Sequence, residues 1–300
     1  MQSEPTPAFE DLDLVRERIG ERLSGVDRIL AVMSGKGGVG KSALAAHLAL
    51  GLAQAGEPTG LLDADLQSPS AARMLGLHGQ PLRLRADPRL QTDSLSPVPG
   101  PAGLRVQGMD FFLQGSEPLA WDGPQAEGAA FRSLLEDAAL ADLLGRTDWG
   151  ALGVLVVDLP PGADRLPVLA RLLPRPLRAL VVTIPTEVSL LAVERSVRRA
   201  LEARIPLLGL VENMGSVACP HCGTESPLFQ EASVAQKARD MGLERIARIP
   251  FDARFAAAAD AGRPLPSEGE EPSPAVRAIR DLAERLRGAG AGEVACRSES

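Results

Sequence analysis

The chain has 300 residues, of which 45% are hydrophobic and 24% are charged, and its formal net charge is −7. The length suits one large α/β domain or two small ones, and the hydrophobic content allows a substantial core. The negative balance argues against a protein that holds nucleic acid by bulk charge, so we expect no nucleic-acid partner.

Apolar runs alternate with segments of helical periodicity along most of the chain. Residues 76–127 are rich in Pro, Gly and Gln and predict loops with one short strand. The alternation indicates an α/β fold with a mostly parallel central sheet covered by helices on both faces. In chain order the predicted elements are a helix over 8–24, a strand over 29–33, a helix over 41–55, strands over 60–63 and 104–107, a helix over 128–144, a strand over 154–158, a helix over 164–173, a strand over 177–184, a helix over 187–203, a strand over 207–211, a helix over 231–241, a strand over 245–249 and a helix over 274–287.

These elements form one expected domain over residues 28–290, with a helical N-terminal extension at 1–27 and a polar tail at 291–300. The first ten residues lack the basic start and apolar run of a secretory signal. No run approaches the roughly 18–20 apolar residues of a membrane span. Three cysteines do not make a disulfide framework. The sequence therefore predicts a cytoplasmic protein without a membrane partner.

A glycine-rich loop joins the first predicted strand to the next helix, which is the context that identifies a phosphate-binding loop. Glycines let the backbone N–H groups turn toward phosphate oxygens, and the helix N-terminus adds positive dipole. A lysine there reaches the β- and γ-phosphates, and the following serine offers a hydroxyl to Mg²⁺. The pattern predicts a three-layer P-loop NTPase that binds ATP, rather than a glycine-rich turn without function. The loop residues are Gly35, Lys36, Gly37, Gly38, Val39, Gly40, Lys41 and Ser42.

Acidic residues close two of the predicted strands. Asp63 and Asp65 end the second strand, and Asp158 ends the apolar strand at 154–158. An acid at the position of Asp158 would hold Mg²⁺ through water, and the Pro-Pro-Gly at 160–162 would form a second switch. Each acid alone is equally well explained as a turn residue. Their order and their places at strand carboxyl ends favour the binding interpretation.

Lys36 is an additional lysine at the start of the loop, and in this the chain resembles the deviant P-loop ATPases, which include the Min and Par ATPases and the Mrp/ApbC proteins. The resemblance implies a homodimer, because this lysine reaches the phosphates of the partner's nucleotide, and slow ATP hydrolysis. It also implies that Asp65 positions or activates the attacking water and that Asp63 supports the Mg²⁺ shell. In relatives an asparagine at the position of Asn213 pairs with the adenine edge, although here it also reads as a strand cap.

Two cysteines, Cys219 and Cys222, stand two residues apart in a segment expected to form an insertion over residues 214–226. Two thiolates at this spacing suit a metal, and a closed Zn²⁺ or 4Fe–4S site takes four. A twofold dimer would supply four from two identical motifs. Thiol redox chemistry fits less well, because a redox pair normally opens a helix.

The position of Cys-Pro-His-Cys just after Glu-Asn-Met narrows the resemblance to the Mrp/ApbC iron–sulfur carriers, over about residues 28–265. Further matching segments are Asp63–Asp65, Trp121–Pro124, Asp158–Gly162, Ile249–Asp252 and Asp260–Pro264. The resemblance implies that Cys219 and Cys222 bind a 4Fe–4S cluster and that the protein delivers it to apo iron–sulfur client proteins.

The sequence departs from that family pattern beside the predicted switches. Gln67 and Ser68 replace an aromatic–glycine pair, and Ala163-Asp164-Arg165 displaces the usual acid after Pro-Pro-Gly. These changes bear on the hydrolysis rate and on switch coupling. Two alternative functions remain: an ATPase with a structural zinc site, and a MinD/ParA-like positioning or partition ATPase. The helix at 274–287 has mixed charges, whereas membrane-targeting helices of that kind are usually basic.

Overall fold

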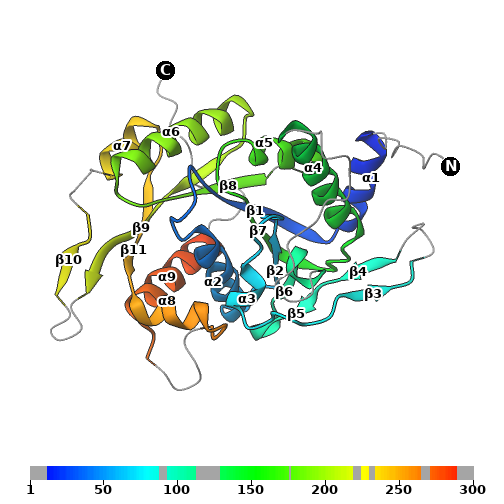
Figure 1. Cartoon of the computed structure of the whole chain (residues 1–300), viewed down its shortest axis with the longest axis horizontal. Helices are drawn as coiled ribbons and strands as arrows, with labels where there is room; N and C mark the ends of the chain where they lie inside the picture. Colours follow the sequence, from blue (N-terminus) through cyan, green and yellow to red (C-terminus); the bar gives the residue numbers. More distant parts are fainter. Residues whose placement is uncertain are drawn as a thin grey trace.

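The computed structural model describes residues 12–87, 93–112, 129–175, 177–218, 224–229, 234–264 and 271–288 (Figure 1). Predicted features in the first eleven residues, at 121–124, at Cys219 and Cys222 and in the C-terminal tail lie outside them. The elements are α1 (Leu12–Arg22), β1 (Val26–Ser34), α2 (Lys41–Gln54), β2 (Thr59–Asp63), α3 (Ala71–Met74), β3 (Arg83–Arg85), β4 (Ser94–Ser96), β5 (Val98–Pro99), η1 (Pro101–Gly103), β6 (Arg105–Gly108), η2 (Met109–Phe111), α4 (Ala129–Arg146), β7 (Leu152–Asp158), α5 (Arg165–Leu172), β8 (Leu177–Thr183), α6 (Glu187–Glu202), β9 (Leu207–Ala218), β10 (Glu225–Pro227), α7 (Val234–Asp240), β11 (Arg245–Phe251), α8 (Ala253–Asp260) and α9 (Pro274–Gly288).

A large sheet forms the middle layer, with strand order β10-β9-β8-β1-β7-β2-β6-β5 and β11 paired to β9. The pairings among β11, β9, β8, β1, β7, β2 and β6 are parallel, whereas the edge strands β10 and β5 pair antiparallel. Helices α1, α4, α5, α6 and α7 cover one face, and α2, α3, α8 and α9 lie on the other (Figure 1). This confirms the predicted three-layer α/β fold with a mostly parallel sheet.

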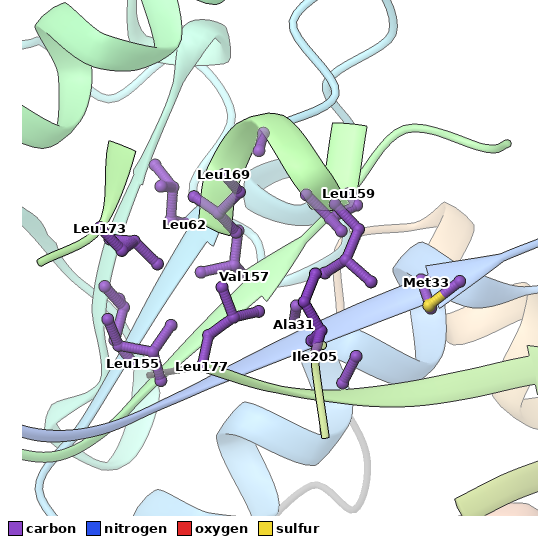
Figure 2. Close-up of a cluster of buried hydrophobic side chains, with 14 of the residues drawn as sticks. Ala31, Met33, Leu62, Leu155, Val157, Leu159, Leu169, Leu173, Leu177 and Ile205 are labelled. Carbon is purple, nitrogen blue, oxygen red and sulfur yellow. The ribbon is translucent and has the colours of Figure 1, made fainter. Parts of the chain in front are cut away.

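The central strands are apolar on both sides because each side faces a helical layer. In β7, Leu155 and Val157 point into the core beneath α5, and Val154 and Val156 point into the core beneath α2. Figure 2 shows the first of these cores, where side chains from four central strands meet Leu169 of α5. Packing on both faces holds the parallel strands in register. Their carboxyl ends carry the candidate site.

Several parts of the chain differ from the sequence predictions. β9 was expected to end at Val211, but it continues to Ala218 because β10 and β11 both pair with its second half. The short helix α3 and helix α8 were not predicted. The stretch expected to hold only one strand also contains β5 and the hairpin of β3 and β4, whose exposed or mixed residues carry no strand periodicity.

The helix predicted near the N-terminus is α1, and it packs into the main core through Val15 and Ile19. Within the described ranges, none of the helices combines the length and apolar character that a bilayer crossing requires.

Candidate active site

The glycine-rich loop connects β1 to α2 at the carboxyl edge of the sheet. Gly40 has φ of 78°, a left-handed conformation that a side chain rarely adopts. A Cβ at Gly40 would also lie 2.3 Å from Nδ2 of Asn213, and one at Gly35 would lie 2.4 Å from the backbone of Ala192 in α6. Glycine is therefore required at both ends of the loop.

Lys41, the first residue of α2, is buried and extends toward the end of β7. Its Nζ donates to Oδ1 of Asp158 and, over 3.1 Å, to the hydroxyl of Ser42. The second oxygen of Asp158 is buried and has no hydrogen-bond partner among the described residues. Burial raises the pKa of Asp158, and the ammonium of Lys41 opposes that rise. The arrangement brings a cation, a hydroxyl and a carboxylate together beside the loop.

Asp63 ends β2 directly opposite Asp158 in the parallel register. Its carboxylate accepts backbone N–H bonds from Asp65 (3.1 Å), Ser70 (2.8 Å) and Ala71 (2.9 Å). Burial and the neighbouring Asp158 raise the pKa of Asp63 to about 7, and the three N–H groups hold it from rising further. Asp63 thus anchors the turn that follows β2 and places a second acid beside the first.

Two segments leave the sheet edge next to these acids, and we call residues 64–70 the first switch segment and residues 159–165 the second. The first contains Asp65, which is half-buried and accepts the N–H of Ser68 over 3.3 Å. The start of the second is tied to β1, since the N–H of Gly162 donates to the carbonyl of Ser34 over 2.9 Å. Lys36 is half-buried, and its ammonium forms no ion pair with any of the residues that the structure describes.

Asn213 lies inside β9 rather than at a strand end, so the strand-cap interpretation is wrong. Its Nδ2 donates to the carbonyl of Val39 over 2.8 Å, which joins β9 to the glycine-rich loop. The same residue lines a cavity of about 200 Å³ together with Met214, Phe255 of α8 and residues 250–252, which end β11 and cap α8. Sequence reasoning assigned no role to Phe255 or α8. The Ile-Pro-Phe-Asp motif at 249–252, which directly precedes α8, was the one nearby signal.

Cys219 and Cys222 lie in the chain between β9 and β10, outside the described residues. The flanking strands pair antiparallel up to Ala218 and Glu225, so the cysteine segment connects two adjacent strands. Over the part of the chain that the structure describes, no group of three or more His, Cys, Asp or Glu side chains is placed to hold a metal ion.

Comparisons with known proteins agree with this geometry. A sequence model of the ParA family, described as NUBPL iron-transfer P-loop NTPase, matches residues 25–287. An iron–sulfur cluster carrier protein of Saccharolobus solfataricus is 34% identical over 258 residues, which cover 85% of this chain and 82% of that protein.

Two solved structures extend the comparison. A nucleotide-binding protein of Archaeoglobus fulgidus in complex with ADP has a TM-score of 0.68 at 33% identity, covering 83% of this chain and 91% of its own. The MinD cell division protein of Aquifex aeolicus has a TM-score of 0.55 at 21% identity, covering 87% of this chain and 97% of its own, and shows likeness of fold alone.

Proposed function

This chain belongs to the ParA family of NUBPL iron-transfer P-loop NTPases, and from that membership we propose that it is an ATPase that carries a 4Fe–4S cluster and delivers it to apo iron–sulfur proteins as a homodimer. One observation carries the proposal. β9 lines the nucleotide cavity at Asn213 and leads, six residues later, to Cys219. Strand β9 would thus connect the proposed nucleotide site to the proposed cluster site.

For the nucleotide, the loop from Gly35 to Gly40 would cradle the phosphates with its N–H groups. Lys41 would leave Asp158 and pair with the β- and γ-phosphates, which offer it more negative charge. The residues fit Mg²⁺: Asp158 keeps a buried oxygen without a hydrogen-bond partner among the described residues, Ser42 supplies a hydroxyl, and Asp63 stands beside them. The ion would neutralise phosphate charge when bound.

Asp65 would position the attacking water, because it stands in the first switch segment just beyond the two buried acids. Lys36 would act across the dimer on the partner's nucleotide. Its half-buried place at the loop and the lack of an ion pair to any described residue support this role. Hydrolysis that needs a second copy would be slow in the isolated chain. We count Lys36, Lys41 and Asp65 as the catalytic residues.

The cluster is the cargo of this reaction. Cys219 and Cys222 would supply two thiolates, and the same residues of a second copy would supply the other two, which completes the four that a 4Fe–4S cluster takes. ATP binding and hydrolysis would change the geometry of the dimer and so control release of the cluster to a client protein.

Anaerobic reconstitution with iron and sulfide tests the cargo assignment. We expect about two irons per chain and a broad visible band, as a 4Fe–4S cluster shared by two chains requires. The double variant Cys219→Ser/Cys222→Ser should bind no iron but retain ADP affinity, whereas Cys296→Ser should behave as the unmodified protein.

Two results would contradict the assignment. Iron retained by the double variant would place the cluster on other residues. A colourless protein with about half a zinc per chain would indicate a shared structural Cys₄ site and leave the ATPase without cargo.

A further inference from the structure

A second cavity, of about 370 Å³, lies between the two switch segments and helix α4. Its wall includes Asp65 and Gln67 from the first segment and Pro161 and Arg165 from the second. Helix α4 closes the third side with Glu136. The cavity is separate from the one beside Asn213 and shares no lining residue with it.

Three side chains meet at the edge of this cavity, one from each of its walls. Nε2 of Gln67 donates to Oε1 of Glu136, and the guanidinium of Arg165 forms an ion pair with Oε2 of the same carboxylate. Arg165 also pairs with Asp137 and donates to the carbonyl of Ser133 over 3.4 Å. One carboxylate on α4 is therefore shared between the two switch segments.

The burial of these charges sets them apart from ordinary surface pairs. The side chains of Glu136 and Arg165 are 11% and 17% exposed. By contrast, Asp142 and Arg146 pair further along the same helix at 51% and 20%. A buried charge that loses its partner stays desolvated without compensation, so Glu136 and Arg165 hold each other in place more firmly than an exposed pair would.

The carboxylate of Glu136 contacts residues that are close in sequence to Asp65 and to the Pro-Pro-Gly turn. Gln67 is two residues from Asp65, and Arg165 is three residues from Gly162. The starts of both segments are already fixed, since the N–H of Ala64 donates to the carbonyl of Asp158 over 2.9 Å and Gly162 is bonded to Ser34. The contact with Glu136 is thus the point at which the far parts of the two segments are joined.

We propose that Glu136 is a positioning residue that couples the two switch segments, so that Asp65 and the Pro-Pro-Gly turn move together when the nucleotide changes state. The inference rests on the proposed ATPase. Gln67 and Arg165 stand at the two places where the sequence departs from the family pattern in its switches, and Glu136 contacts both. The residues that replace the family pattern in the two switch segments are therefore joined to each other by polar contacts through Glu136.

ATP turnover gives the first test. In Glu136→Ala we expect kcat to fall about tenfold while the Kd for a fluorescent ADP analogue stays within about twofold, because Asp65 loses its position and the loop does not. Glu136→Gln keeps only one acceptor oxygen and turns an amide N–H₂ toward either Gln67 or Arg165, so it breaks the link and kcat should fall as well. Asp142→Ala, which breaks an exposed pair on the same helix, should change neither value.

Amide hydrogen exchange of the nucleotide-free protein gives a second test that does not need hydrolysis. Arg165→Ala should accelerate exchange at residues 64–68 about tenfold, because Arg165 reaches that segment only through Glu136. The control is Arg198→Ala, which breaks an exposed ion pair on α6 and should leave exchange at residues 64–68 unchanged.

Unchanged exchange at 64–68 in Arg165→Ala would overturn the coupling, as would an unchanged kcat in Glu136→Ala. A protein without any ATP turnover would instead refute the proposed function. The exchange measurement would still decide whether Glu136 links the segments.

Discussion

Asn213 offers one carbonyl oxygen and two amide hydrogens, and one of those hydrogens is already used by the carbonyl of Val39. Its Oδ1 remains available at the cavity and would accept the N6 amino group of adenine. Guanine presents a carbonyl at that place, so two acceptors would face each other. In the proposed nucleotide site, Asn213 would therefore favour adenine over guanine through a single oxygen atom.

We expect the protein to bind ADP at least about tenfold more tightly than GDP, since an unpaired polar group in a buried site costs about 1–3 kcal/mol. In Asn213→Ala this ratio should fall close to one. Calorimetric titration with both nucleotides measures it. The ratio separates base recognition from loosening of the loop, which would weaken both nucleotides equally. A ratio that survives the substitution would assign adenine recognition to another residue.

His47 lies on α2 behind the same cavity, where its ring contacts that of Phe255 edge-on at 4.6 Å between centroids. Nδ1 bonds the carbonyl of Ala43 over 2.8 Å, and Nε2 has no hydrogen-bond partner among the described residues. Burial lowers the pKa of His47 below its ordinary value of 6.5. The ring is therefore neutral in the folded protein.

This shift makes stability depend on pH with a defined sign. As the pH falls through 6.5, the unfolded chain protonates His47 before the folded chain does, so the contribution of His47 to the free energy of unfolding is fully present above pH 6.5 and is lost as the pH drops. The slope approaches about 1.4 kcal/mol per pH unit. Urea unfolding of His47→Leu between about pH 5 and 7 should show a flatter dependence. The exposed His78 provides the control His78→Gln, and an unchanged slope in His47→Leu would refute the assignment.

At the scale of elements, α1 contributes to the main core although the sequence places it in front of the domain. Ile19 is fully buried beside residues of α4 and α5. Leu14 on the same helix is 62% exposed. Ile19→Ala should lower the free energy of unfolding of the whole chain by about 2–5 kcal/mol in a single transition. Leu14→Ala should change it little, and an early separate transition in Ile19→Ala would show that α1 folds by itself.

The regular strands and helices were predictable because their signals are local. β1, β7 and β8 are continuous apolar runs, since helices cover both of their sides. Helix α8 was not predicted because four consecutive alanines give no periodicity. Its one local signal is the N-cap, Asp252, whose carboxylate accepts the N–H groups of Arg254 and Phe255. The length of β9 depends on its partners β10 and β11, of which β11 is distant in sequence.

The candidate site divides in the same way. The loop and the strand-end acids could be placed from sequence because parallel strands end at one edge of a sheet. The contact of Gln67 with Glu136 joins residues 69 positions apart, and no motif includes Glu136. The contacts of Asn213 and Phe255 with the cavity likewise depend on how β9 and α8 pack. Long-range side-chain contacts of this kind leave no pattern in a single sequence.

At the scale of the whole molecule, the proposed reaction needs two copies of the chain. Lys36 lies at the start of the phosphate loop, and its ammonium is not ion-paired with another residue of the described part of the chain. Lys36→Ala should therefore retain nucleotide affinity within a few-fold and lose dimer formation in the presence of ATP. Sedimentation velocity with ATP and with ADP measures the dimer fraction. Lys237→Ala removes an exposed lysine on α7 as the control, and an unchanged dimer in Lys36→Ala would remove this residue from the interface.

The phosphate loop is held from two sides. Gly35 packs against the backbone of α6, and Asn213 donates to the carbonyl of Val39. A preorganised receptor loses little conformational entropy when its ligand binds. We therefore infer that little of the free energy of phosphate binding is needed to order the loop. That free energy is available to rearrange the two switch segments.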